Sequence, residues 1–162
     1  MDIIFDIDGT VANLDHRLPL VKGKHRDYEA FEAAVSQDKG IESVQFLYEM
    51  LFFAPGFGTG KRLNRILFTS GRSERCREET EKWLEDNDFK GYDKLYMRPD
   101  KMPGTDRNDT RPDTVIKAEM LEQMRKDGYD PKIVFDDRLG VVKQWPKMGV
   151  FCFCVNQGIV DF

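Results

Sequence analysis

Short apolar runs alternate along the chain with longer stretches in which apolar residues recur every three or four positions. The short runs are typical of buried strands, and the longer stretches predict amphipathic helices. The five predicted strands are Asp2 to Asp6, Asn64 to Thr69, Lys94 to Met97, Lys132 to Phe135, and Val150 to Val155. Strands that alternate with helices favour an α/β fold, in which a mostly parallel sheet has helices on both faces.

Three segments carry the helical pattern between these strands. Ser73 to Asn87 opens with a serine, a residue favoured at helix N-termini. Asp113 to Lys126 keeps its apolar residues on one face, and Gly128 is expected to stop it. Arg138 to Lys147 is expected to bend or end at Pro146.

Two insertions interrupt this alternation. The first, Asn13 to Phe53, holds predicted helices near Asp27–Val35 and Ile41–Phe52 and is too small to form a large closing lid. The second, Arg98 to Pro112, is a polar loop with three prolines and four basic residues. A loop of that length is either functional or mobile.

The composition describes an ordinary globular protein with one domain, which we expect to span residues 1–162. The hydrophobic fraction of 40% and the charged fraction of 33% exclude a disordered chain. With 25 basic and 29 acidic residues the net charge is −4, which argues against a protein that coats nucleic acid through bulk charge. Recognition of a single phosphate stays open, because a bound metal ion would add positive charge.

Nothing in the chain points to a membrane. No apolar stretch is long enough to cross a bilayer, so we expect no membrane partner. The first predicted strand follows Met1 directly, and we therefore expect neither a signal peptide nor a preceding domain. These features favour a cytoplasmic location.

Two groups of residues suggest other chemistry but do not support it. Cys152 and Cys154 lie in an apolar run, where we expect buried thiols that fill a strand; with only two histidines in the chain, we expect no zinc. The segment 58–62 resembles a phosphate-binding loop. However, Pro55 and Arg62 stand where such a loop needs glycine and a hydroxyl residue, so we interpret the segment as a turn.

The most informative segment is the end of the first strand, where Asp6 and Asp8 are followed at once by Gly9 and Thr10. Open α/β sheets bind ligands at the carboxyl ends of their strands. Two carboxylates forced together repel each other, and a hard cation such as Mg²⁺ relieves that repulsion. One of them could then act as a nucleophile and the other as an acid and base. The alternative is an acidic turn after a buried strand.

Further polar residues stand near the other strands. Ser70 and Gly71 follow the second strand, and a hydroxyl with a bare backbone N–H suits an oxyanion. Lys117 lies on the predicted helix that begins at Asp113, where a lone lysine is usually solvated. Asp136 and Asp137 follow the fourth strand, and adjacent acids repel unless something pairs with them.

In this order and strand context, the four motifs resemble those of the haloacid dehalogenase superfamily of phosphotransferases. The chain is also similar to the 3′-phosphatase domain of phage polynucleotide kinase–phosphatases over nearly its whole length. That likeness is carried by His16-Arg17, Ser70-Gly71-Arg72, Thr110 to Lys117, Asp136-Asp137-Arg138, Val141-Val142, Trp145 and Asp161-Phe162. The resemblance implies a three-layer Rossmann-like fold with a five-stranded sheet and a minimal cap. Since no kinase domain precedes Met1, we expect a stand-alone phosphatase.

The resemblance also implies roles for the motif residues. Asp6 would attack phosphorus to give an aspartyl-phosphate, and Asp8 would protonate the leaving oxygen and later deprotonate water. Mg²⁺ would be held by the Asp6 carboxylate, the Asp8 backbone carbonyl and Asp136, with Asp137 nearby or bound through water. The choice between Asp136 and Asp137 as the direct ligand stays open.

The remaining motif residues would contact the substrate. Ser70, the Gly71 amide and Lys117 would bind the non-bridging phosphate oxygens. Arg17 and Arg72 would contact the phosphate or its neighbour by analogy with polynucleotide phosphatases. For both arginines the alternative is a surface salt bridge.

We therefore expect a Mg²⁺-dependent phosphatase that removes 3′-phosphates from nucleic-acid ends, its partner being a phosphorylated end. A mononucleotidase or another small-molecule phosphatase is the first alternative, which the acidic net charge favours slightly. A non-catalytic module that binds phosphorylated ends is the second. DNA or RNA preference, oligomeric state and pathway stay open.

Overall fold

The structure is a computed structural model that describes residues 1–22, 24–56 and 62–155. Its strands are β1 (Asp2–Asp6), β2 (Ala12–Asn13), β3 (Lys39–Gly40), β4 (Arg65–Ser73), β5 (Lys94–Arg98), β6 (Pro131–Asp136) and β7 (Phe151–Cys154). Its α-helices are α1 (Tyr28–Ala33), α2 (Glu42–Phe52), α3 (Arg77–Asp86), α4 (Asp113–Lys126) and α5 (Leu139–Val142). Within these described residues, 3₁₀ turns lie at Leu18–Leu20, Val35–Gln37, Glu74–Cys76 and Trp145–Met148.

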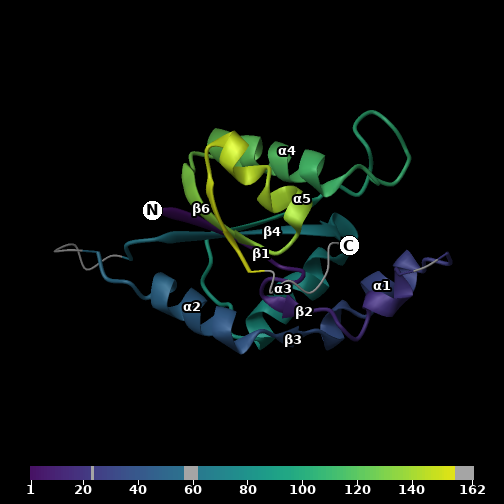
Figure 1. The fold of residues 1–162 in the computed structure, drawn as a ribbon, viewed down its shortest axis with the longest axis horizontal. Coiled ribbons are helices and arrows are strands. Elements are labelled where there is room, and N and C mark those ends of the chain that lie inside the picture. Colours follow the sequence, from purple (N-terminus) through teal and green to yellow (C-terminus); the bar gives the residue numbers. More distant parts are fainter. Residues whose placement is uncertain (23, 57–61, 156–162) are drawn as a thin grey trace.

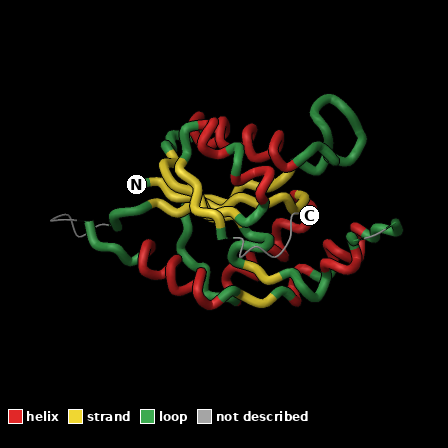
Figure 2. Tube along the Cα trace, viewed as in Figure 1, coloured by secondary structure: helices red, strands yellow, loops and turns green. Residues whose placement is uncertain are grey.

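The predicted parallel sheet is confirmed. Five strands are arranged in the order β5-β4-β1-β6-β7, and every neighbouring pair is parallel. α4 and α5 cover one face, and α2 and α3 lie across the other (Figure 1). The colouring by secondary structure shows the same layers, with the sheet between two groups of helices (Figure 2).

The sheet positions the site by its topology. After β1 the chain moves to β4 on one side, and it returns to β6 on the other side of β1. A crevice forms at such a switch point, outside the carboxyl ends of the strands. Asp6 is the last residue of β1 and pairs in register with Thr69 of β4, while Phe5 pairs with Phe135 of β6.

Alternation along β1 divides the core between the two faces. Ile3 and Phe5 pack into a cluster with residues of α2 and α3, whereas Ile4 packs with residues of α4 and α5. All three side chains are at most 1% exposed. A central strand that is buried on both faces explains why this segment reads as one continuous apolar run.

The first insertion forms a small layer beside the site. It contains α1, α2 and the two-stranded sheet in which β2 and β3 pair antiparallel. The second insertion folds back on itself, with a bridge between Lys101 and Asn108, and extends beyond the start of α4 (Figure 1).

Several expected boundaries are wrong. β4 continues to Ser73 rather than ending at Thr69, because Ser73 still pairs with β5 after a shift in register. The predicted helix over 138–147 is one short helix, α5, followed by a 3₁₀ turn that contains Pro146. The segment 58–61 of the loop that we interpret as a turn lies outside the described residues.

The expectation of buried thiols in the last strand is wrong for Cys154, which is exposed, while Cys152 is half-buried. The physical reason is position, because among the described residues β7 is an edge strand that pairs with β6 alone. Its Phe151 is 64% exposed, so an apolar run at a sheet edge does not imply burial.

Candidate active site

Asp6 and Asp8 lie at the end of β1 but reach different partners. β1 ends at Asp6, and the backbone then turns, with the amides of Thr10, Val11 and Ala12 donating to the Ile7 carbonyl. The two carboxylates therefore do not share a face as they would in a continued strand. Each belongs to a separate group of charged side chains.

Asp6 belongs to what we call the carboxylate cluster, which consists of Asp6, Asp136 and Asp137. Oxygens of these three buried carboxylates lie within 4.8 Å of one another. Lys117, buried on α4, forms an ion pair with Asp6 and donates to Thr69 Oγ1 over 2.7 Å. The structure thus brings Asp6, Lys117, Asp136 and Asp137 together, whereas the side chain of Asp8 lies in a different group.

The electrostatics of the carboxylate cluster show a shortage of positive charge. Burial raises the pKa of Asp6 well above its usual range, although Lys117 opposes this, and Asp136 and Asp137 raise it further. Burial and the nearby Asp136 raise the pKa of Asp137 to about 7. A hard divalent cation prefers oxygen ligands and would relieve this repulsion, so the donor set fits Mg²⁺.

Gly9 makes the close approach of Asp137 possible. Its φ of +87° lies in the left-handed region, which side-chain-bearing residues rarely adopt. A Cβ at this position would lie 2.1 Å from Asp137 Oδ2. A glycine directly after the paired aspartates is therefore required by packing as well as by the turn.

Asp8 belongs to a second group, the arginine cluster, which consists of Asp8, Arg17, Asp38 and Arg72. Arg17 Nη2 donates to Asp8 Oδ1 over 2.7 Å, and Arg72 donates to the same oxygen from Nη2 over 2.8 Å and from Nε over 3.0 Å. Both arginines also donate to Asp38. Their side chains are only 1% and 2% exposed, so the alternative of a surface salt bridge does not describe them.

This pairing gives Asp8 the opposite electrostatic state from Asp6. Burial alone would raise the pKa of Asp8, but Arg72 and Arg17 outweigh it and lower the pKa to about 2. The Arg17 guanidinium also lies 4.1 Å above the ring of Phe31, which limits its movement. In this structure both guanidinium groups contact carboxylates, and their contact with substrate stays a prediction.

Ser70 and Gly71 lie in β4, and Ser70 borders the arginine cluster. Ser70 Oγ lies 3.3 Å from Asp8 Oδ2 and accepts from the Arg72 amide over 3.0 Å. The Gly71 carbonyl accepts from Arg98 Nε over 2.9 Å. Arg98 also forms an ion pair with Asp113, the first residue of α4.

Sequence reasoning missed three residues that hold the site. Asp38 is one of three aspartates in the first insertion, and no motif marks it. In the sequence Arg98 has no signal beyond being one of four basic residues in the loop from Arg98 to Pro112. Trp145 donates from Nε1 to Asp136 Oδ2 over 3.0 Å, and the sequence offered its match to the phosphatase family as the sole signal.

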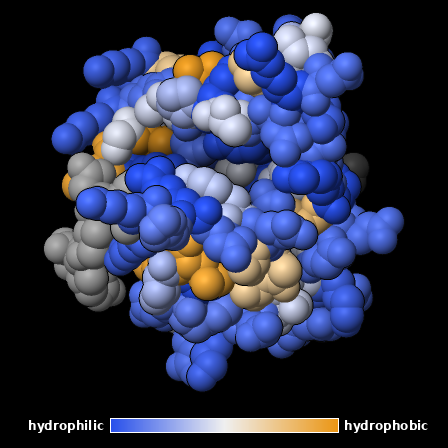
Figure 3. Space-filling view, turned by 90° about the vertical axis from the view of Figure 1, so that its right-hand side faces the viewer, coloured by the Kyte–Doolittle hydropathy of each residue, from blue (hydrophilic) through white to orange (hydrophobic). Residues whose placement is uncertain are grey.

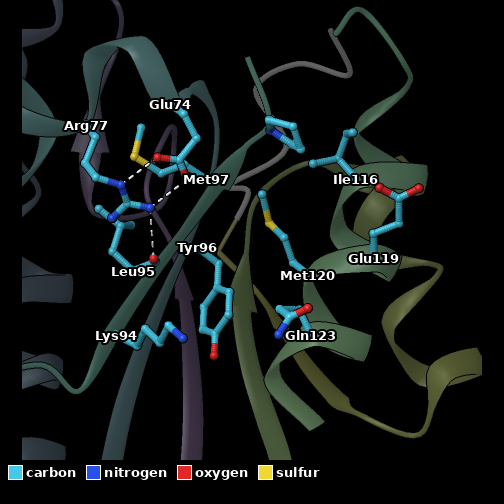
Figure 4. A pocket seen from close by; sticks show the side chains of 11 residues that line it. Glu74, Arg77, Lys94, Leu95, Tyr96, Met97, Ile116, Glu119, Met120 and Gln123 are labelled. Atoms are coloured by element: carbon cyan, nitrogen blue, oxygen red, sulfur yellow. Dashed lines mark hydrogen bonds and ion pairs between the residues drawn. The ribbon is translucent and has the colours of Figure 1, made fainter. Parts of the chain in front are cut away.

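The face that carries the carboxyl ends of the strands is mostly hydrophilic (Figure 3). A separate cavity of about 360 Å³ lies along the outer edge of the sheet, between β5, the start of α3 and α4. Tyr96, Met97 and Met120 line it, and Arg77 beside it binds Glu74 and the Leu95 carbonyl (Figure 4). None of the predicted site residues lines that cavity.

Comparison with known proteins identifies the family. The sequence profile described as "Polynucleotide kinase PNKP phosphatase domain" matches residues 1–162. The chain belongs to the PNKP phosphatase domain family. It is therefore a phosphatase of the haloacid dehalogenase type, as the four motifs indicate.

Relatives and solved structures agree with this PNKP phosphatase assignment. A protein of Autographa californica nuclear polyhedrosis virus, named a bifunctional polynucleotide kinase/RNA ligase, is 31% identical over 153 residues, which cover 91% of this chain and 18% of that protein. A chain in the structure of the Pnkp1/Rnl/Hen1 RNA repair complex has a TM-score of 0.72 and 29% identity, and the match covers 98% of this chain and 43% of that one. The PNKP phosphatase chain thus spans less than half of either.

A more distant structure shows the fold alone. The haloacid dehalogenase-like hydrolase SP0104 from Streptococcus pneumoniae has a TM-score of 0.59 and 12% identity, and the match covers 94% of this chain and 83% of that one.

Among the described residues, no helix is long and apolar enough to span a bilayer.

Proposed function

We propose that this PNKP phosphatase domain removes 3′-phosphates from nucleic-acid ends in a Mg²⁺-dependent reaction through an aspartyl-phosphate. The observation that carries the proposal is the contrast between Asp6 and Asp8. Asp6 lies in a carboxylate cluster that suits a cation, and Asp8 is held nearby by two arginines. Family membership and the viral relative's polynucleotide kinase name support a nucleic-acid end as the substrate.

In the first step an Asp6 carboxylate oxygen attacks phosphorus in line with the ester bond. The bond between phosphorus and the 3′-oxygen breaks, and Asp8 gives its proton to that oxygen. Lys117, Ser70 and the Gly71 amide bind the non-bridging oxygens as their charge grows. The alcohol leaves, and the phosphoryl group stays on Asp6.

In the second step Asp8 takes a proton from a water molecule that attacks the same phosphorus. The bond between phosphorus and Asp6 breaks, and inorganic phosphate is released. The arginines keep Asp8 ionised for this step, which is the form that a general base needs. A phosphate dianion bound beside the cluster favours the protonated form that the first step needs.

The proposed metal ligands are Asp6, the Asp8 backbone carbonyl and Asp136, with Asp137 nearby or bound through water. When bound, Mg²⁺ would neutralise the carboxylates and the incoming phosphate and so let the two anions approach each other. We propose Arg17 and Arg72 as groups that bind the substrate phosphate or its neighbour, in addition to the contacts with Asp8.

The deciding experiment measures phosphate release with and without Mg²⁺ from four substrates. They are a 3′-phosphorylated oligonucleotide, its 5′-phosphorylated counterpart, a 3′-mononucleotide and a 5′-mononucleotide. We expect the first to react fastest, and only with Mg²⁺. A preference for mononucleotides would keep the mechanism and overturn the substrate, whereas no reaction with any of them would favour a binding module.

A further inference from the structure

Asp38 comes, like Arg17, from the first insertion, whereas Arg72 lies in β4 and Asp8 in the turn after β1. Asp38 directly precedes β3, and its side chain is 0% exposed. Its Oδ1 accepts from Arg17 Nε over 2.7 Å, and its Oδ2 accepts from Arg17 Nη2 over 2.6 Å. A bidentate pairing of this kind fixes the plane of a guanidinium as well as its position.

The same carboxylate holds the second arginine. Arg72 Nη2 donates to Asp38 Oδ2 over 2.8 Å and to Asp8 Oδ1 over 2.8 Å. Arg17 Nη2 likewise donates to both Asp38 and Asp8. Each arginine therefore bridges from Asp38 to Asp8, and His16 adds a contact of 2.8 Å between Nε2 and Asp38 Oδ1.

The backbone around Asp38 is also fixed. Trp83 Nε1, from α3, donates to the Asp38 carbonyl over 2.8 Å, and the Asp38 amide donates to Val35 over 3.2 Å. A few residues on, the Ile41 amide donates to the Val11 carbonyl over 2.9 Å. These hydrogen bonds fix the backbone of the insertion at Asp38, so its carboxylate is held in contact with the two arginines.

We propose that Asp38 is a positioning residue for phosphoester cleavage, which fixes Arg17 and Arg72 and through them directs the Asp8 carboxyl toward the leaving oxygen. The inference rests on the proposed function, in which Asp8 transfers the proton. An arginine side chain has many rotamers. The hydrogen bonds of Arg17 and Arg72 to Asp38 restrict these rotamers, and the two arginines in turn restrict the position of the Asp8 carboxyl. The small insertion then serves to orient the acid rather than to close over the substrate.

This role predicts an effect that depends on the leaving group. When a 3′-phosphate is cleaved, the 3′-oxygen of the nucleotide leaves as an alkoxide unless it is protonated, so this cleavage depends on a well-placed Asp8. p-Nitrophenyl phosphate releases a stabilised phenolate and needs little protonation. The hydrogen bonds of Asp38 run to Arg17, Arg72 and His16 and not to Asp6 or Lys117, so we expect kcat for attack on phosphorus to be unchanged for both substrates. Weaker phosphate binding by Arg17 and Arg72 would instead raise KM for both substrates.

The test compares kcat for a 3′-phosphorylated oligonucleotide and for p-nitrophenyl phosphate in the wild type, Asp38→Asn and Asp38→Glu. A misplacement of about 1 Å can lower a rate about 100-fold. We therefore expect Asp38→Asn to lose about 100-fold on the oligonucleotide and less than about threefold on p-nitrophenyl phosphate. Asp38→Glu keeps the charge but shifts it by one methylene, and it should show the same selective loss to a smaller extent.

Glu32→Gln is the matched control. Glu32 lies in the same insertion and forms an exposed ion pair with Arg75 over 3.2 Å, so this variant should match the wild type on both substrates. Turnover of p-nitrophenyl phosphate shows directly that a variant is folded. If Asp38→Asn does not fold, Asp38→Glu decides the question.

Three outcomes overturn the role of Asp38 while the proposed function stands. The first is an equal loss on both substrates, the second is wild-type kcat on both in Asp38→Glu, and the third is a raised KM for the oligonucleotide with unchanged kcat. A wild type that hydrolyses the aryl ester but no alkyl phosphate refutes proton donation by Asp8, and with it the role of Asp38. A wild type that is inactive on both refutes the proposed function itself.

Discussion

The carboxylate cluster and the arginine cluster begin two residues apart, yet their charge balance differs. In the first, three carboxylates lie close together, and Lys117 forms an ion pair with one of them, Asp6. In the second, Asp8 and Asp38 face two guanidinium groups. The pKa values follow this difference, since Asp137 is raised to about 7 and Asp8 is lowered to about 2.

The difference indicates how the site divides its work. In a buried group with excess negative charge, a bound cation or proton relieves the repulsion between the carboxylates. Such a group is suited to bind a metal ion where the phosphate also binds. A charge-balanced group needs no ligand, so it can keep one geometry throughout the reaction. In the proposed mechanism the first cluster holds the cation and carries the phosphoryl group, whereas the second orients Asp8 for proton transfer and contributes Arg17 and Arg72 to phosphate binding.

The largest effect is expected for Asp6→Asn, because Asp6 is the proposed nucleophile of the carboxylate cluster. An amide cannot form the acyl phosphate, so we expect a loss of at least about 10⁴-fold in phosphate release from the 3′-phosphorylated oligonucleotide. Circular dichroism should show an unchanged fold. Asp130→Asn, an exposed aspartate that pairs with Lys132, is the control and should match the wild type. Repeated turnover by Asp6→Asn would remove Asp6 from the nucleophile role.

Removal of the metal tests whether the carboxylate cluster needs a bound cation for activity. We expect a chelator to lower phosphate release by about 10³-fold or more and added Mg²⁺ to restore it, because phosphate must otherwise approach three carboxylates without a cation. Binding of Mg²⁺, followed by calorimetry, should weaken in Asp136→Asn and stay unchanged in Asp130→Asn. Full activity in excess chelator would contradict a metal requirement.

Lys117→Ala removes the ammonium group that forms an ion pair with Asp6 in the carboxylate cluster. We expect a fall of about 10²- to 10³-fold in kcat, similar to the loss of one oxyanion donor. The control is Lys126→Ala on the exposed side of the same helix, which should keep normal activity. A near-normal rate for Lys117→Ala would mean that Lys117 serves packing alone.

The parts of the fold that could be predicted are those set by local pattern. The central strands were found because burial on both faces makes a continuous apolar run, and Asp6 and Asp136 were found because each ends such a run. The exposure of Cys154 could not be predicted, because an edge strand and a central strand of similar composition differ only in their neighbours.

The site shows the same limit. Lys117 is adjacent to no other site residue in sequence, and only its place in an ordered set of motifs identified it. Asp38 has no such signal, since its contacts with Arg17 and Arg72 join positions 21 and 34 residues away. Contacts between distant segments depend on how the insertion folds back over the sheet, which local periodicity does not report.

The smallest expected effects are on the free energy of unfolding in the absence of metal. They test the difference in charge balance between the two clusters directly. A folded-state pKa of about 7 for Asp137, against 3.8 for an ordinary aspartate, means that the folded protein holds a proton that the unfolded chain has released. Stability from this group is therefore present below about pH 4 and is lost as the pH rises toward 7. For Asp8, whose pKa is lowered to about 2, stability is present above about pH 4 and is lost only in stronger acid.

Opposite signs should follow when each carboxylate is removed in the presence of chelator at pH 8. Asp137→Asn removes repulsion and should raise the free energy of unfolding by about 1–3 kcal/mol, and this gain should vanish near pH 4. Asp8→Asn leaves two buried guanidinium groups with Asp38 alone and should lower it by about 3 kcal/mol. Urea unfolding at both pH values measures these changes, with Asp130→Asn as the reference. If both variants were destabilised to the same extent at pH 8, the two clusters would not differ in charge balance, and the division between a ligand-binding group and an orienting group would fail.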